Sequence, residues 1–221
     1  MRKTFLAITL FLAFSKAALA QFGNCTASEM RTYVDSATGN TITMLTDTMK
    51  NDRFLYQTDP MWTADGKYLL FRSSSRGNDK EVESTLPNGE KRKWTPTQIY
   101  FIEMATGKII QATEGPNLGS AFLANKTNRM FVSRKEKENW NMYVMDLNKF
   151  FADVKQGKVG KPSAYETFIG TFPTEMGRPG GYAVDCNDDY AYITVEREGT
   201  EEEKERMMKN AFLPESNQPV K

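Results

Sequence analysis

Short runs of apolar residues, broken by turn-forming residues, follow one another through most of the chain, which is the pattern of β-strands and not of long helices. Residues 61–72 hold two such runs, separated by Asp65 and Gly66, which tolerate the backbone of a tight hairpin turn. Residues 99–113 hold another two, separated by a turn ending at Gly107. We therefore predict four antiparallel strands in sequence, covering residues 61–64, 67–72, 99–103 and 108–113.

This four-stranded unit repeats along the chain. Aligning its first strand pair with residues 122–132 and 183–193 places Phe71, Val132 and Ile193 in register, with 61 residues between successive members. Self-similarity at a fixed period is typical of repeat folds, and four-stranded units of this kind are typical of a β-propeller. A β-sandwich with accidental similarity is the alternative. We predict an all-β chain, a β-propeller of four-stranded antiparallel blades.

The repeats predict blade units near residues 31–47, 54–115, 121–170 and 182–197, the first and last being half blades. Propellers close with about four to eight blades, so we expect an incomplete ring of about three to four blades in the partial propeller domain, residues 21–221. We expect that missing downstream blades close the ring, and that the chain is the N-terminal portion of a longer protein. Assembly with other chains is the alternative.

Two segments differ from the repeats. Residues 1–20 read as a secretory signal peptide, because Arg2 and Lys3 precede an apolar run and small residues end at Ala20. A retained N-terminal anchor is the alternative. We expect secretion across the inner membrane into the periplasm, and no membrane span after the signal. Residues 198–210 predict a helical insertion, with acidic residues near its start and lysine near its end.

Composition narrows the function. Without the signal peptide, 26 basic residues stand against 28 acidic ones, which gives no electrostatic case for binding nucleic acid. The chain contains no histidine, which excludes a Ser-His-Asp triad and a histidine metal site. Cys25 and Cys186 would enter an oxidising compartment, where a disulfide is permitted. Whether they pair is left open, because nothing in the sequence brings them together.

A set of residues along these strands and turns carries a family resemblance: Thr32, Tyr33, Val34, Asp35, Ala37, Thr38, Gly39, Leu45, Thr46, Arg53, Tyr56, Gln57, Asp65, Gly66, Lys67, Leu69, Leu70, Phe71, Ala112, Thr113, Glu114 and Gly115. In these residues the chain resembles the oligogalacturonate lyase family, secreted or cytoplasmic propellers of about seven blades that cleave short pectin fragments by β-elimination. The resemblance covers residues 31–197. Similar turns occur in Tol-type and dipeptidyl-peptidase-type propellers, but the segment containing Arg53, Tyr56 and Gln57 favours the lyase family.

The resemblance implies abstraction of the proton beside a uronate carboxylate, with histidine and arginine as catalytic groups and a manganese-type divalent ion held largely by histidines. Because this chain has no histidine, we assign it no catalytic residue, no metal ligand and no cofactor of its own, and we expect it to be inactive alone. Asp52 stands where relatives can have histidine beside the inter-blade arginine. The competing function is a non-catalytic Tol-type periplasmic propeller that serves as a binding or interaction scaffold.

Strand direction predicts where an acidic oligosaccharide, oligogalacturonate, would bind. The hairpin turns at Gly66 and Gly107 lie on one rim of a blade, so the inter-blade segments and mid-blade loops lie on the other. Arginine suits a uronate carboxylate because its planar fork donates two parallel hydrogen bonds. For each arginine the alternative is an ordinary solvated surface charge. The predicted substrate-binding residues are Arg53, Gln57, Arg76, Arg134, Arg178 and Arg197, with Arg53 foremost because Tyr56 and Gln57 lie beside it.

Overall fold

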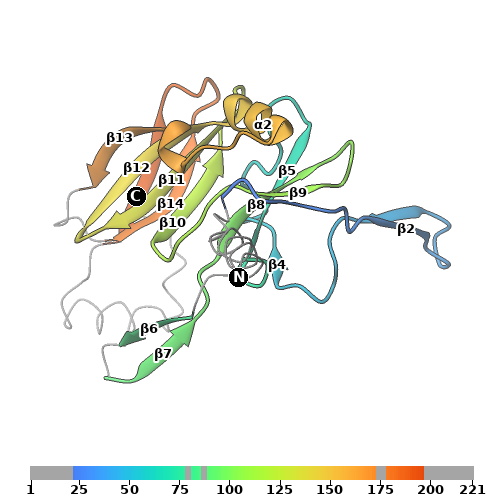
Figure 1. Cartoon of the computed structure of the whole chain (residues 1–221), viewed down its shortest axis with the longest axis horizontal. Helices are drawn as coiled ribbons and strands as arrows, with labels where there is room; N and C mark the ends of the chain where they lie inside the picture. Colours follow the sequence, from blue (N-terminus) through green and yellow to red (C-terminus); the bar gives the residue numbers. More distant parts are fainter. Residues whose placement is uncertain (1–21, 78–80, 86–88, 173–177, 197–221) are drawn as a thin grey trace, which may run out of the picture.

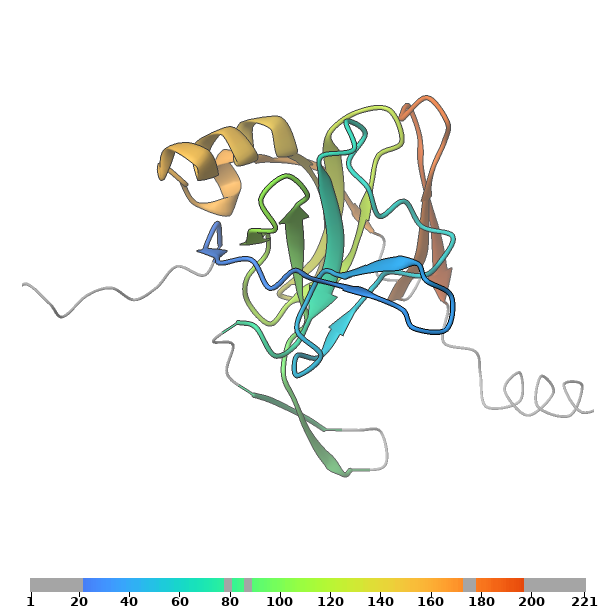
Figure 2. The same cartoon turned by 90° about the vertical axis from the view of Figure 1, so that its right-hand side faces the viewer.

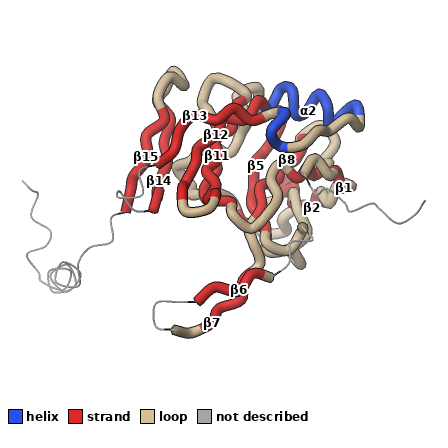
Figure 3. The backbone as a smooth tube through the Cα atoms, turned by 60° about the vertical axis from the view of Figure 1, so that its left-hand side comes forward, coloured by secondary structure: helices blue, strands red, loops and turns tan. Residues whose placement is uncertain are grey.

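A computed structural model describes residues 22–77, 81–85, 89–172 and 178–196 of the chain. The expected signal peptide and the expected helix at residues 198–210 lie outside these ranges. The described part is mostly β-structure in antiparallel sheets, as predicted (Figures 1, 2 and 3). Among the described residues, no helix has the length and apolar character that crossing a membrane requires.

The first large sheet has five strands in the order β1-β9-β8-β5-β4. Their bounds are β1 (Cys25–Thr26), β4 (Asp52–Arg53), β5 (Tyr68–Ser73), β8 (Gln98–Glu103) and β9 (Ile109–Gln111). Three of these strands, β5, β8 and β9, confirm three of the four strands predicted from the sequence. They are buried almost throughout, because alternate side chains enter apolar clusters on opposite faces of the sheet.

The strand predicted at residues 61–64 is the exception. It contributes one bridge, between Trp62 and Leu69, with backbone hydrogen bonds on either side of it. Further along the same edge of β5, the two residues of β4 complete the pairing. The intervening segment, residues 54–60, leaves the edge, and Pro60 has no N–H to return to the ladder. This segment carries Tyr56 and Asp59 away from the sheet edge.

The opposite edge is covered by β1, which the sequence did not indicate. Its Cys25 pairs with Ile110 of β9, and the preceding Gly23 donates from its backbone N–H to the carbonyl of Gln111 at 2.7 Å. Phe22 is buried, with its ring 5.1 Å from that of Phe150. A two-residue strand is too short to show a hydrophobic period, so only tertiary packing defines it.

The second large sheet has four strands in sequence order. They are β10 (Leu118–Leu123), β11 (Arg129–Glu136), β12 (Asn139–Asp146) and β13 (Glu166–Phe172). The helix α2 (Leu147–Gln156) and the short η1 (Pro162–Ala164) lie between β12 and β13. The α2 residue Phe151 stacks on Tyr68 of the first sheet, with ring centroids 3.6 Å apart. The helix therefore shares one hydrophobic core with both sheets. Figure 1 shows it at the upper end of the sheets.

Three hairpins form separate two-stranded sheets. They are β2 (Arg31–Val34) with β3 (Thr41–Met44), β6 (Val82–Thr85) with β7 (Lys91–Trp94), and β14 (Arg178–Val184) with β15 (Ala191–Glu196). The β6–β7 hairpin projects away from the two large sheets in Figures 1 and 2. The β14–β15 hairpin packs beside the second large sheet, through Tyr182, Val184 and Ile193.

Hairpin turns connect successive sheets at the repeat spacing. The backbone N–H of Asp65 donates to the side chain of Asn128, 63 residues later, at 3.2 Å. The carboxylate of Asp188 accepts from the backbone N–H groups of Asn125, Lys126 and Thr127 at 2.6 to 2.9 Å. Burial alone would raise the pKa of Asp188, but these hydrogen bonds outweigh it and lower the pKa. The period seen in the sequence is therefore also a period of contacts between neighbouring turns.

Candidate functional site

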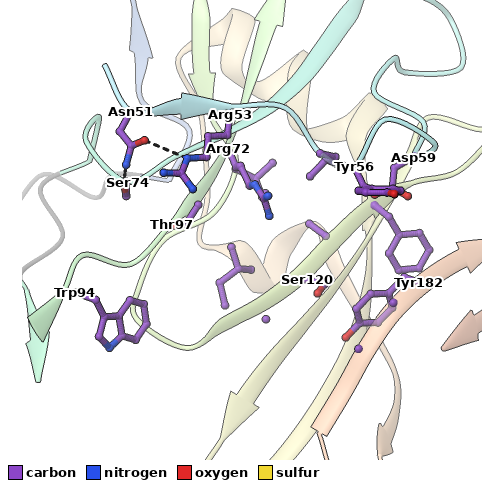
Figure 4. A pocket seen from close by; sticks show the side chains of 18 residues that line it. Asn51, Arg53, Tyr56, Asp59, Arg72, Ser74, Trp94, Thr97, Ser120 and Tyr182 are labelled. Carbon is purple, nitrogen blue, oxygen red and sulfur yellow. Dashed lines mark hydrogen bonds between the residues drawn. The ribbon is translucent and has the colours of Figure 1, made fainter. Parts of the chain in front are cut away.

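A cavity of about 610 Å³ lies where the first large sheet faces β10 of the second and the start of the β14–β15 hairpin. The first sheet contributes Arg53 from β4 and Arg72 from β5, and β10 contributes Ser120. Tyr182 of β14 and Trp94 of β7 also line it. Figure 4 shows Arg53 and Arg72 next to each other on one side of this cavity, between Asn51 and Tyr56, with Trp94 and Tyr182 at its two ends.

Two arginines lie directly opposite each other in this cavity. Arg53 pairs with Arg72 in the β4–β5 register, so both side chains project from the same face of the sheet. Both residues are exposed, and neither forms a salt bridge with any residue that the structure describes. Arg53 donates from Nε to Oδ1 of Asn51 at 3.2 Å, and Asn51 donates in turn to Ser74 at 2.7 Å. Like charges at opposite positions repel, and a bound anion would relieve that repulsion.

Aromatic side chains stand around the paired arginines. Tyr182 is held in place by Phe122, with ring centroids 5.1 Å apart, and by Ser133, whose hydroxyl oxygen lies 2.8 Å from that of Tyr182. Trp94 and Tyr56 are exposed where they line the cavity. Flat aromatic faces can pack against the apolar face of a ring ligand while their polar ends stay in water. The cavity therefore combines a cationic centre with aromatic walls.

Gly119 allows β10 to form its wall of the cavity. A Cβ atom at this position would lie 2.5 Å from Oγ of Ser133 and 2.6 Å from the ring of Trp140. The register of β10 with β11 shifts between Leu118 and Ala121, and the backbone N–H of Ser120 donates to Oγ of Ser133 at 3.0 Å. A larger residue at Gly119 would therefore displace the irregular backbone that lines the site.

The six residues predicted to bind substrate lie in different places. Arg53 lines the cavity, and Gln57 is exposed on the neighbouring segment. Arg76 and Arg134 are engaged in ion pairs. Arg178 begins β14, but its side chain is not among those the structure describes, and Arg197 lies outside the described residues. Of the four candidates with described side chains, the structure thus brings Arg53 into the cavity.

Arg76 is the centre of a buried ion cluster. It donates to Oε1 of Glu29 at 2.9 Å and to Oδ1 of Asp52 at 2.8 Å, and its side chain is only 6% exposed. Burial alone would lower the pKa of Arg76, but the hydrogen bonds to both carboxylates raise it above its ordinary value. The hydrogen bonds from Arg76 also lower the pKa of Glu29. Its donors are therefore directed at this cluster and not at a ligand.

Arg134 is engaged in the same way, one sheet further along the chain. It forms a bidentate pair with Glu166 of β13, one bond measuring 2.6 Å, and the Glu166 side chain is 4% exposed. Its guanidinium carbon also lies 5.8 Å from the ring centre of Tyr143. A bidentate pair of this kind joins β11 to β13 across the intervening strand β12.

The sequence did not single out three of the cavity residues, Arg72, Trp94 and Tyr182. The sequence feature that could have indicated Arg72 is its position, because it is the one charged residue in the mostly apolar strand β5. A charge within such a strand must face solvent or a partner. Trp94 and Tyr182 carried no such signal, since a tryptophan or tyrosine in a strand is usually explained by packing.

The manganese-type ion implied by the resemblance does not fit the residues present. Among the described residues, no three histidine, cysteine, aspartate or glutamate side chains gather in a group that could hold a metal ion. The full sequence also lacks histidine, the ligand type that the resemblance implies.

Comparison with known proteins gives matches among solved structures. Neither a protein-family model nor a curated protein matches the chain. An oligogalacturonate lyase in complex with manganese is 20% identical, with a TM-score of 0.50, over 74% of this chain and 35% of that one. An oligogalacturonate lyase from Vibrio parahaemolyticus is 22% identical, with a TM-score of 0.47, over 70% and 32%. The chain thus spans about a third of the first of these structures, and the likeness to it is one of fold.

Proposed function

We propose that this chain is part of a β-propeller of the oligogalacturonate lyase type and that it binds oligogalacturonate in the cavity between its sheets. The observation that carries the proposal is the opposed pair of Arg53 and Arg72, two exposed cations on one face of the sheet in a cavity of about 610 Å³. A uronate carboxylate placed between them would accept hydrogen bonds from both guanidinium groups. The fold likeness to a solved oligogalacturonate lyase supports the choice of ligand.

The propeller part of the proposal is supported by the contacts between neighbouring sheets. Their turns meet at spacings of 61 to 63 residues, and each large sheet follows the previous one in sequence. We take the two large sheets as blades and the β2–β3 and β14–β15 hairpins as parts of further blades, about three to four in all. Export to the periplasm belongs to the same proposal and is supported by the signal-like residues 1–20.

The proposed role of the cavity residues is to bind and orient the ligand. Neutralising a uronate carboxylate makes the proton on the adjacent carbon easier to remove, because the developing negative charge is stabilised. Arg53 and Arg72 are placed to supply that positive charge, while Asp59, which also lines the cavity, can accept hydrogen bonds from sugar hydroxyls. We assign proton abstraction to no residue of this chain, and we expect no turnover by the chain alone.

Calorimetric titration of the full chain with trigalacturonate, compared with a neutral galactose trisaccharide, tests the proposal. We expect the acidic sugar to bind more tightly. Arg53→Ala and Arg72→Ala should each weaken binding by about 1.5 to 3 kcal/mol, as for a lost hydrogen bond to a charged group. The double variant should lose less than the sum, since both residues hold one carboxylate.

Arg31→Ala is the matched control, because Arg31 is an exposed arginine of β2 that does not belong to the cavity. It should leave the affinity unchanged. Equal affinity for the acidic and the neutral sugar would refute the proposal, as would cavity variants that bind like Arg31→Ala. The first of these outcomes would leave the non-catalytic scaffold as the better hypothesis.

A further inference from the structure

The β6–β7 hairpin ends beside the cavity. Trp94, the last residue of β7, lines the cavity, and the hairpin projects from there away from the large sheets (Figures 1 and 4). Its strands are paired in regular register from Val82 opposite Trp94 to Thr85 opposite Lys91. A ligand that leaves the cavity past Trp94 would therefore meet the face of the hairpin on which Trp94 lies.

The two faces of this hairpin differ in how many charged residues they carry. Directly opposite residues share a face and neighbours in a strand alternate, so Trp94 and Arg92 lie on one face, with Val82 and Ser84 opposite them. Glu83, Lys91 and Lys93 lie on the other face, where Lys91 and Glu83 form a salt bridge of 2.7 Å. Within the paired residues of β6 and β7, Arg92 is thus the one charged group on the face of Trp94, and no described residue forms a salt bridge with it; Glu90 lies just outside these paired residues.

We propose that Arg92 and Trp94 form an outer subsite that binds a further acidic sugar unit of a longer oligogalacturonate, an inference that rests on the proposed function. Two residues along a strand correspond to about 7 Å, so Arg92 lies beyond Trp94 on the same face and further from the cavity. Trp94 offers a flat face to a sugar ring, and Arg92 offers a guanidinium fork to the next carboxylate. The hairpin therefore gives the site a preference for longer acidic chains.

Chain-length dependence of binding tests this subsite. The full chain is titrated with digalacturonate, trigalacturonate and hexagalacturonate, alongside the variants Arg92→Gln and Lys93→Gln. We expect the wild-type chain to bind the hexamer more tightly than the dimer. Arg92→Gln should lose about two- to fivefold in affinity for the hexamer, the range expected of one exposed charge pair, and nothing for the dimer.

Lys93→Gln is the matched control, because it removes the same charge from the adjacent residue on the opposite face. It should retain the affinity for the hexamer. If both variants lose affinity equally, the effect is a general one of net charge and the subsite is refuted. It is also refuted if Arg92→Gln keeps the full length dependence. Dimer binding by the wild-type chain separates this failure from a failure of the proposed function, in which no acidic sugar would bind at all.

Discussion

The two faces of strand β4 show two uses of the same kind of charge. Arg53 and Asp52 are neighbours on this strand, so their side chains project to opposite faces of the sheet. On one face Arg53 stands exposed in the cavity opposite Arg72. On the other, Asp52 is 9% exposed and binds Arg76, which is 6% exposed. Two neighbouring residues of β4 thus lie in different surroundings. Arg53 is a cation available to a ligand, whereas Asp52 holds the cation Arg76 in an enclosed ion pair.

The difference arises from the partners that each face supplies. Arg76 meets two carboxylates, Asp52 and the more distant Glu29, and the ring of Phe71 lies beneath its guanidinium group at 5.3 Å. Arg53 lies opposite Arg72 in the strand register, and its side-chain hydrogen bond goes to the neutral Asn51. A predicted ligand-binding arginine is therefore better judged by whether carboxylates share its face than by its place in a loop.

Removing Arg76 should produce the largest effect on stability. Arg76→Met would leave the carboxylates of Asp52 and Glu29 without their cation in a site where Asp52 is 9% exposed. Breaking a buried pair by removing one partner lowers the free energy of unfolding by about 3 to 5 kcal/mol. Urea denaturation followed by tryptophan fluorescence measures this change.

Arg53→Met provides the comparison, since it removes an exposed arginine from the other face of the same strand. Exposed substitutions of this kind usually change stability by less than about 0.5 kcal/mol. Equal destabilisation by the two variants would show that the two faces do not differ as described.

Acid should weaken the Arg76 cluster to a smaller extent. The hydrogen bonds from Arg76 lower the pKa of Glu29 below its ordinary value of 4.5. A carboxyl group whose pKa is lower in the folded chain contributes stability above its ordinary pKa, and this contribution disappears as the pH falls through the lowered value. We expect the difference in unfolding free energy between Arg76→Met and the wild-type chain to shrink from pH 6 to pH 3.

Comparison with the variant is needed because other carboxylates also lose stabilising bonds in acid. Burial alone would raise the pKa of Asp65, but hydrogen bonds led by that from Thr63 lower it to about 2. The pKa of Asp188 is also lowered. Both groups contribute equally in the wild-type chain and in Arg76→Met, so they cancel. A difference that stays constant with pH would exclude Glu29 as the titrating partner of Arg76.

The sequence predicted the interior of the first large sheet better than its edges. The strands at residues 67–72, 99–103 and 108–113 were predictable because their apolar runs are buried on both faces. The edges depend on short pieces from elsewhere in the chain. β1 and β4 each have only two residues, which is too few to show the alternation of apolar and polar residues that marks a strand. Edge pairing of this kind follows from tertiary contacts and cannot be derived from local pattern.

The candidate site was predictable only in part, for the same reason. Arg53 was singled out by the resemblance and by Tyr56 beside it, and it does line the cavity. Arg72 was hidden within a strand that reads as core. Arg76 is not available to a ligand because it binds carboxylates, and one of them belongs to Glu29, 47 residues earlier in the chain. Long-range ion pairing of this kind leaves no local trace in a sequence.

The smallest effect we expect is that of salt concentration. It should distinguish the two faces of β4 without any substitution in the cavity. Raising sodium chloride from about 0.05 M to about 0.5 M shortens the screening length to a few ångströms, which weakens interactions of exposed charges far more than those of buried pairs. Trigalacturonate binding at Arg53 and Arg72 should therefore weaken several-fold, because both arginines are exposed. The stability difference between the wild-type chain and Arg76→Met should change little, because Arg76 and Asp52 are enclosed.

Calorimetric titration and urea denaturation at the same two salt concentrations measure the two quantities side by side. A salt-independent affinity would argue against a charge-based site at Arg53 and Arg72, and a strongly salt-dependent stability difference would argue that water reaches the Arg76 cluster freely.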